Sequence, residues 1–236
     1  MYILNDVSKH YRMGRRAVTA LDHVDLVIED GEWLAVQGRT GSGKTTLLQI
    51  LGALDRPSEG AIRLDGLDLA NLREARLTEL RAASIGFVFQ TFNLLPTLSA
   101  VENVEAALVP LRVPGSERRA RALKALDDVG LSDRAAHLPS ELSGGQQQRV
   151  GIARALVKEP KVLLADEPTG NLDENTRDDI ISLLEELWRQ HALTLVLVTH
   201  DRAIADRARR VGVMREGHLL FERDAADAAV RHAVNH

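Results

Sequence analysis

The sequence predicts an α/β fold in which a mostly parallel sheet is flanked by helices, with an antiparallel β portion and an inserted α-helical portion. Alternating apolar residues near the N-terminus are typical of half-buried strands. Residues 162–165 and 193–198 are nearly continuous apolar runs, as expected for strands buried on both faces of a parallel sheet. Between them, residues 174–190 place apolar side chains at helical spacing. This alternation of strand and helix indicates the α/β class.

Composition agrees with a folded domain and excludes several kinds of site. The 236 residues suffice for one domain, with room for an inserted subdomain. Apolar residues make up 44% and charged residues 27%, which argues against a disordered or fibrous chain. The net charge of -4 lacks the basic excess of non-specific nucleic-acid binders, so we expect no nucleic-acid partner. Because there is no cysteine, disulfides, thiolate metal sites and cysteine nucleophiles are excluded.

The predicted elements follow one another in a regular order. Residues 24–28 alternate as a strand, and a turn follows at Asp30 and Gly31. Residues 33–36 form a short apolar run, and a glycine-rich loop leads from it into a helix predicted over residues 45–53. Two further short strands are predicted over residues 61–64 and residues 85–89.

The middle of the chain changes character. Residues 91–140 contain four prolines and helical patterns such as residues 118–129, so we interpret this segment as a mostly helical insertion. The whole chain is then predicted to be a single domain. Its parts are a catalytic core of residues 1–90 and 141–222 that includes the N-terminal β subdomain, a helical subdomain of residues 91–140, and a C-terminal tail of residues 223–236.

Nothing in the sequence predicts a membrane span or a secretory leader. No apolar run approaches the roughly 18 residues that a span requires. Residues 1–16 carry charges and no apolar stretch of the kind found in signal peptides. We therefore expect the chain to stay in the cytosol and to reach a membrane only through a partner.

The glycine-rich loop fits a phosphate-binding pattern. Residues 38–45 match G-x-x-x-x-G-K-[ST] between an apolar strand and a helix. Glycines let backbone N–H groups surround phosphate oxygens, and the helix directs its positive end at the same anion. Lys44 adds charge for the β- and γ-phosphates, and the Thr45 hydroxyl can ligate Mg²⁺. Since an ordinary glycine-rich turn rarely matches every position, we predict a P-loop NTPase core. The predicted nucleotide-binding residues of this segment are Gly38, Arg39, Thr40, Gly41, Ser42, Gly43, Lys44, Thr45 and Thr46.

Two carboxylates end the apolar run at residues 162–165. At the carboxyl end of a parallel strand, Asp166 is expected near the phosphate loop, where it would orient Mg²⁺ directly or through water. Glu167 points the other way along the pleat and is the candidate to polarise the attacking water. The competing interpretation is a solvated strand end followed by a turn at Pro168.

Two more polar residues follow predicted strands. His200 comes after residues 193–198, and we expect it to contact the γ-phosphate, although a single histidine is more often structural. Gln90 directly follows the strand predicted over residues 85–89, and its amide can bind Mg²⁺ or the attacking water. The predicted catalytic residues are Glu167, His200, Lys44 and Gln90, and the predicted metal ligands are Thr45, Gln90 and Asp166.

A third glycine motif opens a predicted helix at residues 142–146. Ser143 and the glycines present hydroxyl and N–H donors at the helix N-terminus, a second place for an anion. Taken alone, a plain N-cap is the better interpretation. The chain would then carry two phosphate-seeking loops and only one full nucleotide pocket, which suggests that a second copy supplies the other half.

With these motifs in this order, residues 2–222 resemble the ATP-binding cassette (ABC) ATPases. The resemblance implies that two cassettes pair head to tail and that each ATP lies between the phosphate loop of one and the signature of the other. It also implies that Tyr11 stacks on adenine, that Gln90 lies in a loop facing a membrane permease contacted by the helical subdomain, and that Asp173 bridges the dimer. The signature residues are Leu142, Ser143, Gly144, Gly145 and Gln146.

Four stretches resemble one branch of these ATPases, the lipoprotein-release and macrolide-export type. They are residues 11–14, 54–57, 86–98 and 165–173. The resemblance implies an ATP- and Mg²⁺-dependent subunit that powers a separate permease for lipoprotein, peptide or drug-like cargo, cytoplasmic and peripheral on the inner face of the cell membrane. In the phosphate loop, Arg39 and Thr40 replace the Pro-Ser common in this branch; both positions contribute mainly backbone, so ATP binding should survive.

Two alternatives to this transport role stay open. One is a cell-division type ATPase that regulates cell-wall hydrolysis through a membrane partner without transport. The other is a soluble ABC protein of translation or DNA repair. Proteins of that second kind usually have two cassettes or a long coiled-coil insert, and this chain has neither.

Overall fold

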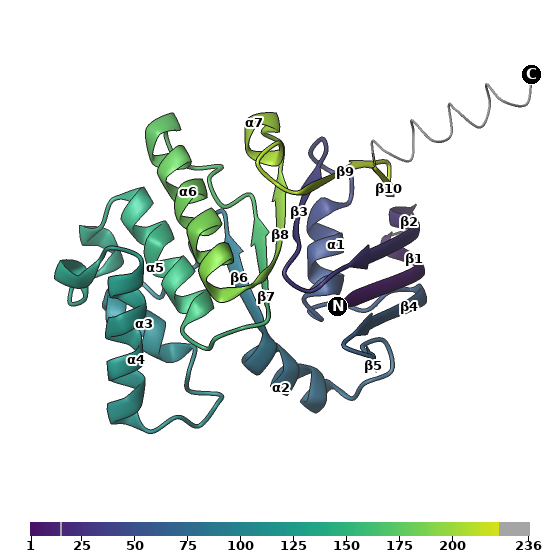
Figure 1. Ribbon diagram of the computed structural model, residues 1–236. Coiled ribbons are helices and arrows are strands. Elements are labelled where there is room, and N and C mark those ends of the chain that lie inside the picture. Colours follow the sequence, from purple (N-terminus) through teal and green to yellow (C-terminus); the bar gives the residue numbers. More distant parts are fainter. Residues whose placement is uncertain (15, 222–236) are drawn as a thin grey trace, which may run out of the picture. The chain divides into compact units, whose positions relative to one another are not determined.

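The computed structural model describes residues 1–14 and 16–221 (Figure 1). Within these limits the chain forms two compact units. The first contains Met1–Leu72 and the described residues from Val196 onward, and the second contains Arg73–Leu195. Both units combine strands with helices, so the predicted α/β class is confirmed.

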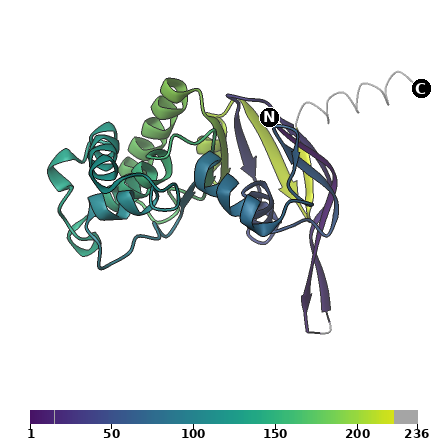
Figure 2. The ribbon, with the colours of Figure 1, turned by 90° about the horizontal axis from the view of Figure 1, so that it is seen from below.

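An antiparallel sheet with the strand order β2-β1-β4-β5 forms one half of the first unit. Its strands are β1 (Tyr2–Met13), β2 (Arg16–Ile28), β4 (Glu59–Leu64) and β5 (Leu67–Asp68). The strand predicted over residues 24–28 is the end of β2. The pairing of β1 with β4 stops at Ser8, whereas β1 and β2 continue as a long hairpin (Figure 2).

The phosphate loop belongs to the other half of the first unit. There β3 (Trp33–Gln37) is parallel to β9 (Arg210–Arg215), and β9 is antiparallel to β10 (His218–Phe221). On its other side β3 neighbours β8 (Thr194–Thr199), which begins in the second unit and continues into the first. Helix α1 (Lys44–Leu51) follows β3 after the loop.

All the side chains of β8 are buried, as predicted for a strand covered on both faces, and the first four side chains of β3 are buried as well. The short helix α7 (Arg202–Ala205) follows β8.

The second unit is built on the parallel pair β6 (Ile85–Phe89) and β7 (Val162–Asp166). Helix α6 (Glu174–His191) has the apolar face predicted for it, with Ile180, Leu184 and Leu187 buried. The remaining helices are α2 (Glu74–Ser84), α3 (Ala100–Ala106), α4 (Gly115–Asp128) and α5 (Gly144–Leu156), with 3₁₀ turns η1 (Ser132–Arg134) and η2 (Pro139–Glu141).

Between residues 91 and 140 the regular elements are all helical, namely α3, α4 and the two 3₁₀ turns, and α3 and α4 pack against each other and against α5 (Figure 1). The buried Asn103 holds the loop before α3 by bonding both the N–H and the carbonyl of Leu95. The division into core, helical subdomain and tail stays a prediction, and the tail of residues 223–236 lies outside the described residues. In the described part of the chain, no helix combines the length and the apolar character needed to cross a membrane.

Candidate functional site

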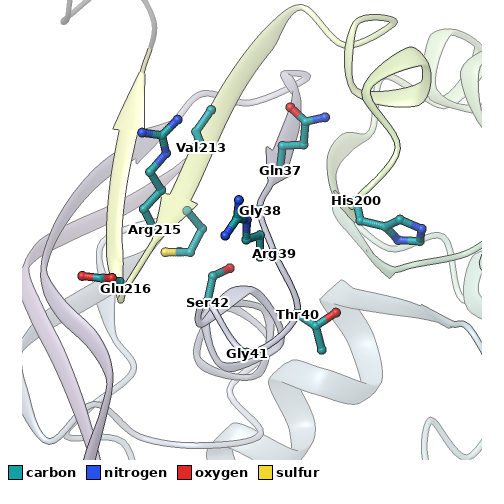
Figure 3. A pocket seen from close by; sticks show the side chains of 11 residues that line it. Gln37, Gly38, Arg39, Thr40, Gly41, Ser42, His200, Val213, Arg215 and Glu216 are labelled. Carbon is teal, nitrogen blue, oxygen red and sulfur yellow. The ribbon is translucent and has the colours of Figure 1, made fainter.

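The phosphate loop lines an open pocket of about 900 Å³ in the first unit. The pocket lies where β3, β8 and β9 end, which is the edge of a parallel sheet where ligands commonly bind. Figure 3 shows the lining side chains around the loop. They are Gln37, Gly38, Arg39, Thr40, Gly41, Ser42, His200, Val213, Met214, Arg215 and Glu216. The structure thus brings the predicted residue His200 to the phosphate loop.

The loop has the shape and the polar groups that suit a phosphate. Gly43 has φ 109°, and a Cβ there would lie 2.2 Å from the carbonyl oxygen of Ala20, so only glycine fits. The Oγ of Ser42 is buried without a hydrogen-bond partner among the described residues. The Lys44 ammonium is buried and donates to the carbonyls of Gly38 (2.8 Å) and Arg39 (3.0 Å). An anionic ligand with several oxygens matches this set of donors.

The hairpin between β9 and β10 helps to hold the loop. The N–H of Gly217, at the turn of this hairpin, donates to the carbonyl of Ser42 at 3.1 Å. Within the loop, the N–H of Ser42 donates to the carbonyl of Arg39 at 3.1 Å. The loop is therefore tied to its own sheet, as a preorganised anion site requires.

Tyr11 lies on the β1–β2 hairpin of the same unit and is held by Asp55. Its hydroxyl donates to Asp55 Oδ2 at 2.8 Å, and Lys9 Nζ donates to Asp55 Oδ1 at 2.6 Å. Lys9 Nζ also lies 5.0 Å from the centre of the Tyr11 ring. Partial burial, together with the hydrogen bond to Asp55, raises the pKa of Tyr11. Tyr11 is not among the described residues that line the pocket.

Gln90 and Glu167 follow adjacent strands of the second unit. Phe89 pairs with Asp166 in the parallel register, so the next residue on each strand leaves the same edge. Gln90 Nε2 donates to Asn171 Oδ1 (3.1 Å), and Asn171 Nδ2 donates to the Gln90 carbonyl (3.1 Å). Glu167 has φ 48°, a left-handed conformation at the point where the chain turns away from β7.

The signature segment caps helix α5. Ser143 Oγ accepts from the N–H of Gln146 at 3.3 Å, and Gln146 Oε1 accepts from the N–H of Ser143 at 2.9 Å. This is a reciprocal capping box. Leu142 is buried, and a Cβ at Gly145 would lie 2.5 Å from Thr176 Cγ2 of α6. The capping geometry leaves the Ser143 hydroxyl proton available as a donor, because Oγ serves only as an acceptor in the cap.

Asp173 caps helix α6. Its Oδ1 accepts from the N–H of Thr176 at 3.1 Å, and its Oδ2 accepts from the Thr176 hydroxyl at 2.7 Å. The backbone N–H of Thr176, helped by the hydroxyl, lowers the pKa of Asp173. Asp173 is therefore an ionised cap at the N-terminus of α6.

A family model described as "ABC transporter" matches residues 21–170. The chain belongs to the ABC transporter family. The "Uncharacterized ABC transporter ATP-binding protein YvrO" of Bacillus subtilis is 47% identical over 222 residues, which cover 94% of this chain and 96% of that protein. The "Macrolide export ATP-binding/permease protein MacB" of Rhodospirillum rubrum is 48% identical over 217 residues, 92% of this chain but 33% of that protein.

A comparison with solved structures supports the same family. A dimeric structure of the ATP-binding cassette MJ0796, in a post-hydrolysis state bound to ADP and Pi, has a TM-score of 0.86 and 44% identity. The match covers 93% of this chain and 96% of that chain. The protein is thus an ABC ATPase that binds and hydrolyses ATP, and its P-loop NTPase fold is confirmed.

The predicted site residues of this cassette fall into two groups. The phosphate loop, Tyr11 and His200 lie in the first unit. Gln90, Asp166, Glu167, the signature and Asp173 lie in the second. Among the described residues, no three His, Cys, Asp or Glu side chains gather as a metal-binding cluster.

Sequence reasoning missed two residues that support these groups. Asp55 holds Tyr11, and nothing local in the sequence connects them across 44 positions. Gln148 is completely buried in α5 and bonds backbone carbonyls of two other segments. A signal for Gln148 was present, because it shares the buried helix face of Gly145 and Ile152, where a polar residue is unusual.

Proposed function

We propose that this cassette powers a separate membrane permease for the export or extraction of lipoprotein, peptide or drug-like cargo. The observation that carries the ATP-driven part is the loop pocket with its buried Lys44 and unpaired Ser42 Oγ. The transport part is supported by the identity of 48% with a protein named as a macrolide export ATP-binding/permease protein. The cassette then acts at the cytoplasmic side of the membrane, held there by the permease, with the helical subdomain of residues 91–140 as its contact.

In the proposed binding mode the loop of residues 38–43 surrounds the phosphates, and the N-terminus of α1 adds its positive end. Lys44 neutralises the β- and γ-phosphates, and Thr45 and Thr46 complete the site at the start of the helix. Tyr11 stacks on the adenine ring, in the orientation that Asp55 imposes. Thr45, Gln90 and Asp166 would hold Mg²⁺, which supplies neutralisation of phosphate charge.

In the proposed hydrolysis step a water attacks the γ-phosphorus in line with the bond to the β-phosphate oxygen. Glu167 accepts the proton of this water, and Gln90 orients it. The bond between the γ-phosphorus and the β-phosphate oxygen breaks, which yields ADP and inorganic phosphate. Lys44 and His200 stabilise the negative charge that spreads over the γ-phosphate oxygens in the transition state.

We propose further that two copies share each ATP. The signature segment offers donors at a helix N-terminus but no lysine, so it suits the second side of a nucleotide rather than a whole site. Ser143 of the partner subunit would contact the γ-phosphate, and Asp173 would bridge the two copies. The dimeric form of the similar cassette MJ0796 supports this arrangement.

The substitution Glu167→Gln tests this function. It removes the proton acceptor and keeps the shape, so ATP binding should stay nearly intact while turnover stops and an ATP-bound dimer accumulates. Phosphate release and size-exclusion chromatography measure the two effects. Glu79→Gln is the control, since among the described residues the ion pair of Glu79 is with Arg76, on the exposed face of α2. Hydrolysis by Glu167→Gln near the wild-type rate would remove Glu167 from the mechanism.

Co-purification of the native membrane partner tests the transport role. Mass spectrometry of the complex should identify a large permease with an extracytoplasmic domain. A small four-span partner would instead support the cell-division alternative.

A further inference from the structure

Gln148 is a buried amide that joins three segments of the second unit. Its side chain is 0% exposed within α5. Its Nε2 donates to the carbonyl of Pro168 at 2.6 Å and to the carbonyl of Phe89 at 3.3 Å. Both amide protons are used, whereas Oε1 has no hydrogen-bond partner among the described residues.

The two carbonyls stand directly beside the residues to which we assign the attacking water. Phe89 is the last residue of β6 and precedes Gln90, and Pro168 follows Glu167. The parallel register pairs Phe89 with Asp166, so these two chain exits are neighbours. The Gln148 side chain thus bonds the backbone immediately before Gln90 and immediately after Glu167.

Further hydrogen bonds hold the loop after β6, which contains Gln90, to helix α5. Arg154, which follows Gln148 further along α5, donates to the carbonyls of Phe92 (2.8 Å) and Asn93 (2.5 Å). Gln148 and Arg154 therefore attach the two ends of residues 89–93 to α5. Since α5 begins at the signature, this helix also connects the signature to the loop that carries Gln90.

Packing alone does not explain a glutamine at this position. An apolar side chain of the same length would fill the space without burying an unpaired Oε1, and an unpaired buried acceptor is unfavourable. The amide of Gln148 is explained by its two N–H groups, because without them the carbonyls of Phe89 and Pro168 would lose these hydrogen-bond donors.

From this geometry we propose that Gln148 is a positioning residue for ATP hydrolysis, whose amide fixes Gln90 relative to Glu167 so that the attacking water is oriented. The proposal rests on the proposed function, because it requires these two residues to act on the water. Gln148 itself touches neither ATP nor water in this scheme.

The substitution Gln148→Met keeps the length of the side chain and removes both donors. We expect kcat to fall about tenfold while KM for ATP changes by less than about twofold, since the phosphate loop is untouched. Gln190→Met is the matched control: it removes a glutamine amide that pairs with Glu186 on the exposed side of α6, and it should leave kcat unchanged.

A double-mutant cycle separates positioning from a structural role. If Gln148 acts through Gln90, then Gln148→Met should cost less than about twofold when Gln90→Ala is already present. A merely structural loss would multiply with the effect of Gln90→Ala. Where Gln148→Met does not fold, as judged by circular dichroism, Gln148→Asn takes its place in the same cycle, because it keeps an amide that is too short to reach both carbonyls.

Two results would overturn the proposal: a Gln148→Met enzyme with more than half of the wild-type kcat, or multiplicative effects in the cycle. Either result combined with an inactive Glu167→Gln enzyme leaves the proposed function standing and removes only the role of Gln148. Hydrolysis by Glu167→Gln, in contrast, defeats the proposed function whatever Gln148 does.

Discussion

The phosphate loop and the cluster around Gln90 are built on different principles. The loop uses consecutive residues 38–45, and its shape depends on backbone that a Cβ would block, as at Gly43. The cluster uses side-chain amides from separate segments, namely Gln90, Gln148 and Asn171. The first is therefore sensitive to added atoms, and the second to lost hydrogen bonds. Substitutions of each kind can test this difference.

The largest effect is expected from adding one methyl group to the loop. Gly43→Ala would bring Cβ within 2.2 Å of the Ala20 carbonyl oxygen at φ 109°, so both the backbone and its neighbour must move. We expect loss of ATP binding by calorimetry and a loss of unfolding free energy of about 3 kcal/mol or more.

Gly41→Ala is the matched variant in the same loop. Gly41 has φ 79° but nothing within 4 Å of an added Cβ, so only conformational strain of about 1 kcal/mol is expected. Equal losses in the two variants, measured by denaturant unfolding, would show that close approach does not distinguish these glycines.

An intermediate effect is expected from the amide cluster. Asn171→Leu removes both hydrogen bonds to Gln90, each worth about 1 kcal/mol, so kcat should fall about tenfold with little change in KM. Steady-state phosphate release measures this. Asn71→Leu, which removes a bond to Asp68 on the surface, is the control. An unchanged kcat in Asn171→Leu would mean that Gln90 acts without the hydrogen bonds from Asn171.

The smallest effect concerns the support of Tyr11. Although partial burial opposes it, the hydrogen bonds from Lys9 and Tyr11 hold the pKa of Asp55 below its usual range. A carboxyl whose pKa is lowered by folding stabilises the fold fully at pH values above its unfolded-state pKa. This stabilisation is lost as the pH falls through the folded-state pKa. Asp55→Asn should therefore cost on the order of 1 kcal/mol at neutral pH and almost nothing in acid.

Urea unfolding of wild type and Asp55→Asn from neutral to acidic pH measures this difference. Asp133→Asn serves as the control, since within the part of the chain that the structure describes Asp133 pairs with its exposed neighbour Arg134. A stability difference that stays constant across the pH range would contradict the assigned hydrogen bonds.

The contrast between a site made of consecutive residues and a site made of separate segments explains which features could be predicted from the sequence. The loop and α1 were predicted because the residues of the phosphate-binding motif lie in one short stretch of sequence, and α6 because its buried side chains repeat at helical spacing. The ends of β8 and α1 differ from the prediction by one or two residues, because end positions depend on hydrogen bonds that the hydrophobic pattern does not encode. The tie between Tyr11 and Asp55 could not be predicted, since it joins separate elements.

Three consecutive glutamines show where the sequence stops and the tertiary structure decides. The sequence alone determined that residues 146–148 lie in the first turns of a helix opened by Ser143. The fold gave each amide a different role: Gln146 caps the helix through Ser143, Gln147 bonds the carbonyl of Leu142, and Gln148 bonds the carbonyls of Phe89, at the end of β6, and Pro168, in the turn after β7. Identical side chains differ in role because helical rotation turns only Gln148 toward the end of β6 and the turn after β7, whose carbonyls were brought there by the packing of the second unit.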